Sequence, residues 1–275
     1  ATSSWNSAAG FIPIAFPNDR FTGSLNGNNF EIDGLYINRP DDNNIGLFST
    51  IRGGSVSNLG LTNVNITGDR YIGGLVGDLD GDSITNVFVT GAVTGYWDVG
   101  GLIGSSYEEA VVQNCYSTAT VVGGSDVGGL VGNSYLTIID SYSTGNVTSS
   151  NIYGGGLVGD NKGSITKSYA TGNVDGRSGS GGLVGYNKGH ISYSYSHGDV
   201  HSTFNAGGFA GYNDSTIVNS YSTGAVTSNF DPSGFISYAY SNSKVISSFW
   251  DKEASGVNAA VDNGSAEGIT GVTTA

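Results

Sequence analysis

The chain has 275 residues, of which 46 are Gly, and its formal net charge at pH 7 is −13. Phosphate contacts need clustered Lys and Arg, so ten basic against 23 acidic residues argue against a nucleic-acid partner. The single Cys excludes an intrachain disulfide, and no apolar run approaches the roughly 20 residues of a membrane span. With 37% hydrophobic residues and four Pro, the composition indicates a folded chain whose backbone turns often.

Residues 1–44 contain short strand-like runs but depart from the repeat that begins after them. We expect them to form an N-terminal capping segment together with the first strands. The chain begins at Ala1 without a signal-peptide pattern, so we expect it to be a segment excised from a longer protein.

A glycine-containing string recurs eight times between residues 45 and 251, and GGLVG is its most regular form. Its large apolar residue returns every 26–28 residues, at Leu47, Leu75, Leu102, Leu130, Leu157, Leu183, Phe209 and Phe235. A second string, such as SYATGNV from Ser168, follows most copies. Short Val, Ile, Tyr and Thr runs broken by Gly and Asn predict strands and turns rather than a helical solenoid.

A unit of this length holds about three short strands and three corners, which is one coil of a parallel β-helix, whereas a propeller blade needs about 40–45 residues. We therefore predict an all-β fold, a parallel right-handed β-helix of about eight coils with irregular end caps. Successive coils would be about 4.8 Å apart. Residues 45–251 form the repeat solenoid and residues 252–275 a C-terminal cap or tail, all within one continuous domain.

Alternation along a strand assigns the two faces of each repeat. Small or apolar residues suit the narrow interior, so Ser168, Ala170 and Val174 are predicted to point inward and Tyr169 outward. Cys115 lies in the inward column of Ser168, which favours a small buried filler over a reactive thiol. The paired glycines mark either a positive φ or a close contact between coils.

A column of aromatic residues is the candidate ligand-binding surface. It recurs once per coil between Phe88 and Phe249, at Tyr116, Tyr142, Tyr169, Tyr195 and Tyr221. Stacked coils would bring the rings about 4.8 Å apart, close enough for offset stacking. The column is therefore either a structural ladder that stiffens the rod or an exposed platform for sugars or a protein partner.

One short loop has the composition of a metal site. The segment DLDGDS places the carboxylates of Asp78, Asp80 and Asp82 at alternate positions, and hard cations such as Ca²⁺ favour oxygen clusters of this kind. A solvated acidic turn is the other interpretation of the same residues. We expect no other cofactor.

The repeats resemble the GLUG family, through GGLVGDNKGSITKSYATGNV from Gly155 and its counterparts between about residues 45 and 226. The flanks, such as FWDKEASG from Phe249, are similar to the usual ends of such arrays. The family occurs in bacterial and archaeal surface proteins, including adhesins, haemagglutinin-like proteins and regions of immunoglobulin A-specific metallopeptidases. The resemblance implies a non-catalytic module, and the chain carries no HExxH pair that could support peptidase chemistry.

These observations predict an extracellular, cell-surface module that acts as a structural stalk or an adhesive surface. Its partner would be a protein or glycan on a host or neighbouring cell. Two alternatives remain open at this point. One is a carbohydrate-binding or polysaccharide-active β-helix, although no catalytic residues can be named, because Lys and Arg are scattered and the acidic residues fall mostly at coil junctions. The other is a filament subunit that self-associates through the open ends of the solenoid.

Overall fold

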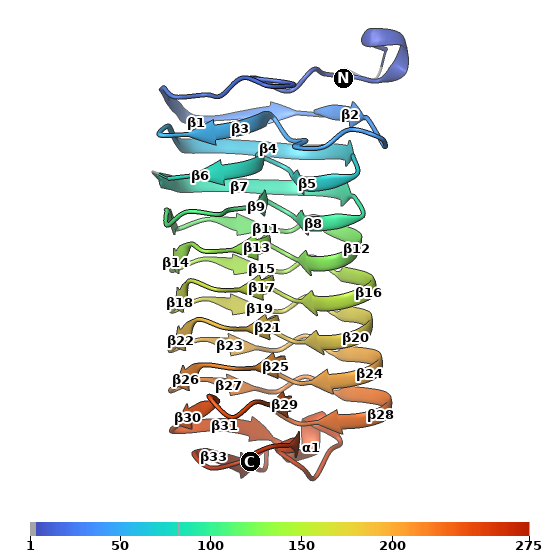
Figure 1. The fold of residues 1–275 in the computed structure, drawn as a ribbon, viewed down its shortest axis with the longest axis vertical. Coiled ribbons are helices and arrows are strands. Elements are labelled where there is room, and N and C mark those ends of the chain that lie inside the picture. The colour runs from blue at the N-terminus through green and yellow to red at the C-terminus, as the bar shows by residue number, and fades with distance from the viewer. Residues whose placement is uncertain (1–3, 82, 275) are drawn as a thin grey trace.

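The chain forms a parallel β-solenoid, as the repeats predicted. The computed structural model describes residues 4–81 and 83–274. Coils are stacked in chain order from the N-terminal to the C-terminal end (Figure 1). Each coil crosses two parallel sheets, of nine and 24 strands. The nine-stranded sheet contains one more strand than the eight glycine strings, because β32 pairs with β29 and continues the sheet.

The nine-stranded sheet consists of β3 (Phe48–Arg52), β6 (Val76–Asp80), β9 (Ile103–Ser105), β13 (Val131–Ser134), β17 (Val158–Asn161), β21 (Val184–Asn187), β25 (Ala210–Asn213), β29 (Ile236–Ala239) and β32 (Val261–Asn263). Except for β32, each of these strands begins near the end of a glycine string, so the string ends one corner and opens this face.

The 24-stranded sheet covers the other two faces of the coils. Its strands are β1 (Ser24–Asp33), β2 (Tyr36–Asn38), β4 (Ser55–Thr67), β5 (Arg70–Gly73), β7 (Ser83–Thr94), β8 (Trp97–Gly100), β10 (Val111–Gln113), β11 (Tyr116–Ser117), β12 (Thr120–Gly128), β14 (Thr137–Ile139), β15 (Tyr142–Ser143), β16 (Val147–Gly155), β18 (Ser164–Thr166), β19 (Tyr169–Ala170), β20 (Val174–Gly181), β22 (His190–Ser192), β23 (Tyr195–Ser196), β24 (Val200–Gly207), β26 (Thr216–Val218), β27 (Tyr221–Ser222), β28 (Val226–Ser233), β30 (Lys244–Ile246), β31 (Ser248–Asp251) and β33 (Ile269–Val272).

Two short helices lie at the ends of the chain. The 3-10 helix η1 (Asn6–Ala8) precedes the first strands, and α1 (Lys252–Ser255) follows β31. The carboxylate of Asp251 caps α1 by accepting hydrogen bonds from the backbone N–H groups of Glu253 and Ala254. Within the described residues, no helix is long and apolar enough to cross a bilayer.

The N-terminal segment packs onto the first coil. Ile14 and Phe21 form isolated parallel bridges with Phe48 and Ile51 of β3, and the rings of Phe21 and Phe48 are 4.7 Å apart. Strand β1 in turn pairs with β4 in the 24-stranded sheet. The segment therefore adds both apolar cover and backbone pairing to the N-terminal end.

The interior is filled by columns of equivalent residues, and the predicted inward set is confirmed. Ser168, Ala170 and Val174 are all buried, and Leu, Val and Ile residues of the other columns complete a main apolar core along the rod. A small second cluster consists of Val200, Ala206 and Val226. Each coil buries the same positions as its neighbours, so the core grows by one layer per repeat.

The serine column provides hydrogen-bond partners for buried backbone groups inside this core. The hydroxyl of Ser168 donates to the carbonyl of Thr166 at 2.9 Å and accepts the backbone N–H of Ser141 in the preceding coil at 3.2 Å. Ser194 repeats both contacts. The buried backbone N–H groups are therefore satisfied by side chains, which link coil to coil without a strand at this corner.

Cys115 takes the same position and is a buried filler, as predicted. Its backbone N–H donates to the hydroxyl of Ser141 at 3.1 Å, and its thiol lies 3.3 Å from the carbonyl oxygen of Gln113. Burial raises the pKa of this thiol to about 12.

The paired glycines of the repeat strings are required because coils approach closely there, since none of them has a positive φ. A Cβ atom on Gly129 would lie 2.2 Å from the carbonyl oxygen of Gly156 in the next coil. A second column is tighter still, because a Cβ on Gly172 would lie 1.9 Å from the carbonyl oxygen of Gly145. Backbone atoms cannot move aside as a flexible side chain can, so a side chain at Gly129 or Gly172 would force neighbouring coils apart. One coil carries Ala119 at the position equivalent to Gly145, so the second column is not made of glycine throughout.

We expect Gly172→Ala to lower the free energy of unfolding by about 2 kcal/mol or more, because the added methyl group displaces a neighbouring coil. Denaturant unfolding followed by circular dichroism measures the change. Gly23→Ala is the matched control, since its Cβ would meet only ring atoms of Phe21 at 3.5 Å. Equal stability of the two variants would contradict the close-packing explanation.

We expect the thiol of Cys115 to resist labelling by Ellman's reagent at pH 8 in the native protein, because it is buried and protonated. The same sample in guanidinium chloride should react fully and so confirms that the thiol is free. Rapid labelling of the native chain would mean that this corner of the solenoid opens.

Candidate functional site

The predicted aromatic column forms an outward, stacked ladder. Neighbouring rings from Tyr116 to Tyr195 have centroids 4.8 Å apart and interplanar angles of 1–3°. Phe88 and Tyr221 extend the ladder at the two ends, with centroid distances of 4.9 and 5.0 Å. In-register pairing of the short strands β11, β15, β19, β23 and β27 sets this spacing.

The ladder presents ring edges and hydroxyl groups rather than broad apolar faces. Each inner ring has a parallel ring on both sides, so its faces are partly covered and its exposure is intermediate. Partial burial and the neighbouring hydroxyl groups raise the pKa of Tyr142 and Tyr195, so these phenols stay neutral hydrogen-bond donors and acceptors.

A groove lies at the corner that follows the ladder in each coil. Its volume is about 460 Å³, and it spans four coils. It is lined by Asn146, Val147, Thr148, Asn173, Val174, Asp175, Asp199, Val200, His201, Ala225 and Thr227. The sequence reasoning placed Val174 inward, where it is buried, but did not find that the neighbouring polar side chains enclose a hollow above it.

The predicted calcium ligands are only partly brought together. Asp78 and Asp80 both lie on β6 and alternate with buried Leu79, so their carboxylates share the outer face. Asp80 pairs with Arg52 at 3.4 Å, and burial together with the charge of Asp80 raises the pKa of Asp78 to about 6. Asp82 lies outside the described residues. Among those that the structure describes, no group of three His, Cys, Asp or Glu could hold a metal ion.

A row of buried carboxylates on another corner was missed by sequence reasoning. Asp98 and Asp126 occupy equivalent positions of adjacent coils, and Asp160 on β17 lies next to Asp126. All three are at most 8% exposed, and each retains one carboxylate oxygen without a hydrogen-bond partner. The ammonium groups of Lys162 and Lys188 lie 3.2 and 3.0 Å from the carboxylate of Asp160.

Lys162 and Lys188 therefore compensate one end of the row. Burial, followed by the charge of Asp126, raises the pKa of Asp98. Burial and the charge of Asp160 likewise raise the pKa of Asp126. Because Asp98 is nearly inaccessible, we interpret Asp98 and Asp126 as a structural contact in which the two carboxyl groups share protons, and not as a catalytic dyad.

Further tyrosines gather beside the lysines on the nine-stranded sheet. Tyr186, Tyr212 and Tyr238 occupy one in-register column, and Tyr153 and Tyr240 flank it. Their rings are 4.7–6.2 Å apart but mostly tilted, unlike those of the ladder. The ammonium group of Lys188 lies 4.0 Å from the ring centroid of Tyr186, which is a cation–π contact.

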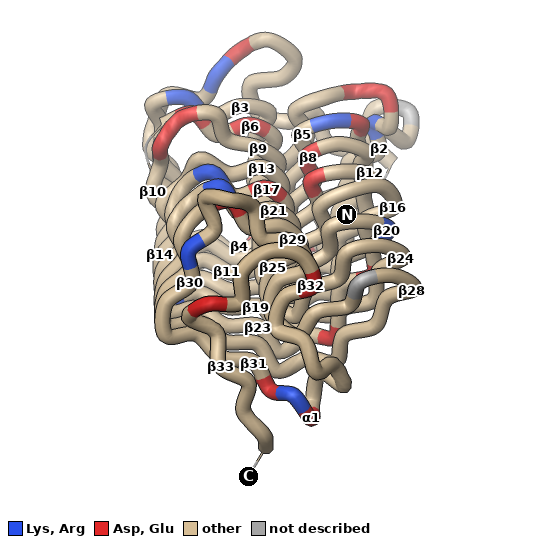
Figure 2. The backbone as a smooth tube through the Cα atoms, turned by 60° about the horizontal axis from the view of Figure 1, so that its bottom comes forward, with Lys and Arg blue, Asp and Glu red and all other residues tan. Residues whose placement is uncertain are grey.

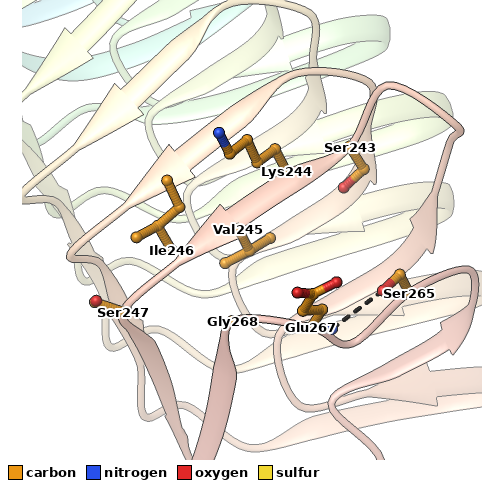
Figure 3. Close-up of a pocket in the computed structure, with 8 residues that line it drawn as sticks. All are labelled: Ser243, Lys244, Val245, Ile246, Ser247, Ser265, Glu267 and Gly268. Carbon is orange, nitrogen blue, oxygen red and sulfur yellow. Dashed lines mark hydrogen bonds between the residues drawn. The ribbon is translucent and has the colours of Figure 1, made fainter.

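A second hollow, of about 400 Å³, lies at the C-terminal end of the rod. Figure 3 shows that β30 and the segment 265–268 line it from opposite sides. The backbone N–H of Glu267 donates to the hydroxyl of Ser265 at 3.2 Å, which fixes the turn. Four of its eight lining residues are Ser or Gly, and Lys244 and Glu267 are the charged residues among them.

In the view of Figure 2, Lys and Arg positions lie among Asp and Glu positions along the described backbone. Four of the six ion pairs among the described residues have their basic partner at Arg52, Lys162 or Lys188.

The stacked repeats define a class of protein, the parallel β-solenoid, and comparison with known families identifies the repeats. Residues 95–122 and 202–227 match the GLUG motif, and residues 13–91 match the N-terminal region of the M26 IgA1-specific metallo-endopeptidases. The chain therefore carries GLUG repeats, as the resemblance indicated.

Two similar proteins place these repeats in longer chains. Halomucin of Haloquadratum walsbyi is 42% identical over 104 residues, which are 37% of this chain and 1% of that protein. A Gly-rich membrane protein of Evansella cellulosilytica is 45% identical over 84 residues, which are 29% of this chain and 10% of that protein. The chain thus matches only a small part of either relative. No solved structure matches it.

We expect stability to fall as the pH rises from about 4 into the alkaline range, because the pKa of Asp98 is raised in the folded state. The folded protein then binds a proton more tightly than the unfolded chain. This contribution is complete below the usual carboxyl pKa and is lost as the pH rises through the raised one.

Asp98→Asn should flatten this dependence and stabilise the protein at pH 9 by about 1 kcal/mol or more. Asn also tolerates the φ of 53° at this position. Asp41→Asn, an exposed change, should leave the profile as it is. Thermal unfolding between pH 4 and 9 provides the measurement, and an unchanged slope in Asp98→Asn would contradict the assignment.

Proposed function

We propose that the chain is a non-catalytic, extracellular module of a cell-surface protein, where it acts as a rigid stalk and presents an adhesive surface. The observation that carries this proposal is the uninterrupted stacking of the repeats, two of which match the GLUG motif, into one solenoid. Continuous coil-to-coil pairing and a main apolar core that runs along the rod favour a stiff spacer over a flexible linker.

The two relatives support the same setting. One is named a mucin and the other a membrane protein, and in both the matched segment is a minor part of the chain. A repeat module within a long surface protein is consistent with these matches. Its acidic net charge also suits a solvated exterior surface.

The tyrosine ladder is the proposed adhesive contact. It runs without a break from Phe88 to Tyr221, and its hydroxyl groups repeat once per coil from Tyr116 onward. Such a row offers amphipathic edges to a protein or glycan on another cell. The same stacking stabilises the fold, so a test has to separate binding from stability.

Replacing Tyr142, Tyr169 and Tyr195 together by Ser removes four stacked contacts. Since each pair contributes about 0.5–1.5 kcal/mol, we expect the free energy of unfolding to fall by about 2 kcal/mol or more. Adhesion of beads coated with the folded variant to target cells should fall strongly relative to the wild type.

A matched control is Tyr96→Ser with Tyr193→Ser, which removes exposed tyrosines outside the ladder. Both proteins are tested below their melting temperatures. If the ladder variant is less stable but adheres as well as the wild type, the ladder is structural only and the adhesive surface lies elsewhere.

A further inference from the structure

The groove beside the ladder is built by two walls that repeat in register. One wall is the column Thr148, Asp175, His201 and Thr227, in which each residue pairs with its counterpart in the next coil. The imidazole of His201 is hydrogen-bonded to the hydroxyl of Thr227 at 2.9 Å. All four side chains are exposed, whereas the valines between the walls are buried and form the floor.

The other wall is held in place by the backbone. The side-chain oxygen of Asn146 accepts the backbone N–H of Asn173 at 3.0 Å, and that of Asn173 accepts the N–H of Asp199 at 3.0 Å. Asp199 accepts the N–H of Ala225 at 2.9 Å in the same way. Each bond fixes a rotamer and leaves the second polar atom of the side chain free among the described residues. The wall is thus preorganised, which lowers the entropic cost of binding.

The groove has the size and shape for an extended ligand. Its volume of about 460 Å³ is in the usual range for ligand sites. It crosses four coils, so at about 4.8 Å per coil it runs roughly 14 Å along the rod. Amide, carboxylate, hydroxyl and imidazole groups recur along this length at the spacing of the coils.

The lining selects among classes of ligand. It includes Asp175 and Asp199 but no Lys or Arg, so uronate, sulfate and phosphate groups would meet uncompensated negative charge. The strands beneath it are already paired, since β20 bonds to both β16 and β24. A peptide therefore finds no free strand edge here, and no aromatic side chain lines the groove to form an anchoring pocket.

We propose that this groove binds a neutral, hydroxyl-rich oligosaccharide that lies parallel to the rod axis. Sugar hydroxyl groups would exchange hydrogen bonds with the free amide groups of Asn146 and Asn173 on one wall. On the other wall they would bond to Asp175 and His201. This proposal rests on the proposed function for its setting, because it names the ligand class of an adhesive surface.

A glycan array with the full chain tests the ligand class. The array carries neutral α- and β-linked hexasaccharides beside hexagalacturonate and sulfated glycans of equal length. We expect binding to neutral hexasaccharides and none to the anionic ones. Titration of the best neutral hexasaccharide should give tighter binding than its disaccharide, because the groove spans several sugar units.

The double variant Asp175→Ala/His201→Ala should lower the affinity for that hexasaccharide about tenfold, because it removes two hydrogen-bonding side chains. Its melting temperature should stay unchanged, since both side chains are exposed. Asp41→Ala/His190→Ala is the matched control, with the same residue types at exposed positions outside the groove, and should bind like the wild type.

Three results would overturn the proposal. They are no binding to any neutral hexasaccharide, equal binding to hexagalacturonate, and full affinity in the Asp175→Ala/His201→Ala variant. Binding of hexalysine in place of the sugars would assign the groove to a basic peptide instead. If sugars bind in the groove while coated beads do not adhere to cells, the groove proposal stands and the adhesive function fails. If the coated beads adhere to cells but no sugar binds in the groove, the adhesive function stands and the groove proposal fails.

Discussion

The structure depends on the in-register approach of successive coils. Equivalent residues pair across the parallel sheets, for example Tyr142 with Tyr169 and Val147 with Val174. This register is possible only where two backbones come close enough at the corners, and a Cβ on Gly172 would lie 1.9 Å from the carbonyl oxygen of Gly145 in the preceding coil. The glycine columns therefore set the spacing, and the spacing sets every ladder on the surface and in the core.

The narrow interior also has to satisfy its buried polar groups. Serine hydroxyl groups bond to the backbone of the neighbouring coil, as at Ser141 and Ser168. Buried asparagine amides form a second row, in which Asn161 donates to Asn187 and Asn187 donates to Asn213. A corner in a solenoid leaves backbone groups that no strand can pair, so small polar side chains take that role. The repeated Ser and Asn of the sequence are explained by this need.

The repeat period allowed most of the fold to be predicted, because one assignment of faces applies to every coil. The outward position of Tyr169 and the burial of Cys115 follow from alternation alone. The ninth strand of the smaller sheet did not follow, since β32 pairs in place without a copy of the glycine string.

The carboxylate row and the groove, which both depend on the geometry of corners, could not be predicted from the sequence either. The carboxylate row joins Asp126 to Asp160, which are 34 positions apart, on two different faces of adjacent coils. Asp126 is followed in its column by Tyr153, so the row breaks the repeat instead of extending it. The groove walls do repeat, but alternation says only that Asn173 and Asp175 point outward. How far apart two outward side chains stand at a bend is set by backbone geometry, which no residue pattern encodes.

The in-register stacking of equivalent coils determines how such chains can change length. Because each coil meets its neighbours through the same glycine, serine and tyrosine columns, a deletion or duplication of one whole coil rejoins matching surfaces. A change of 26 residues, the interval from Leu157 to Leu183, would preserve every ladder, whereas a change of a few residues would shift all of them out of line. Recombination between repeats can thus alter the reach of the rod in steps of one coil without designing a new interface.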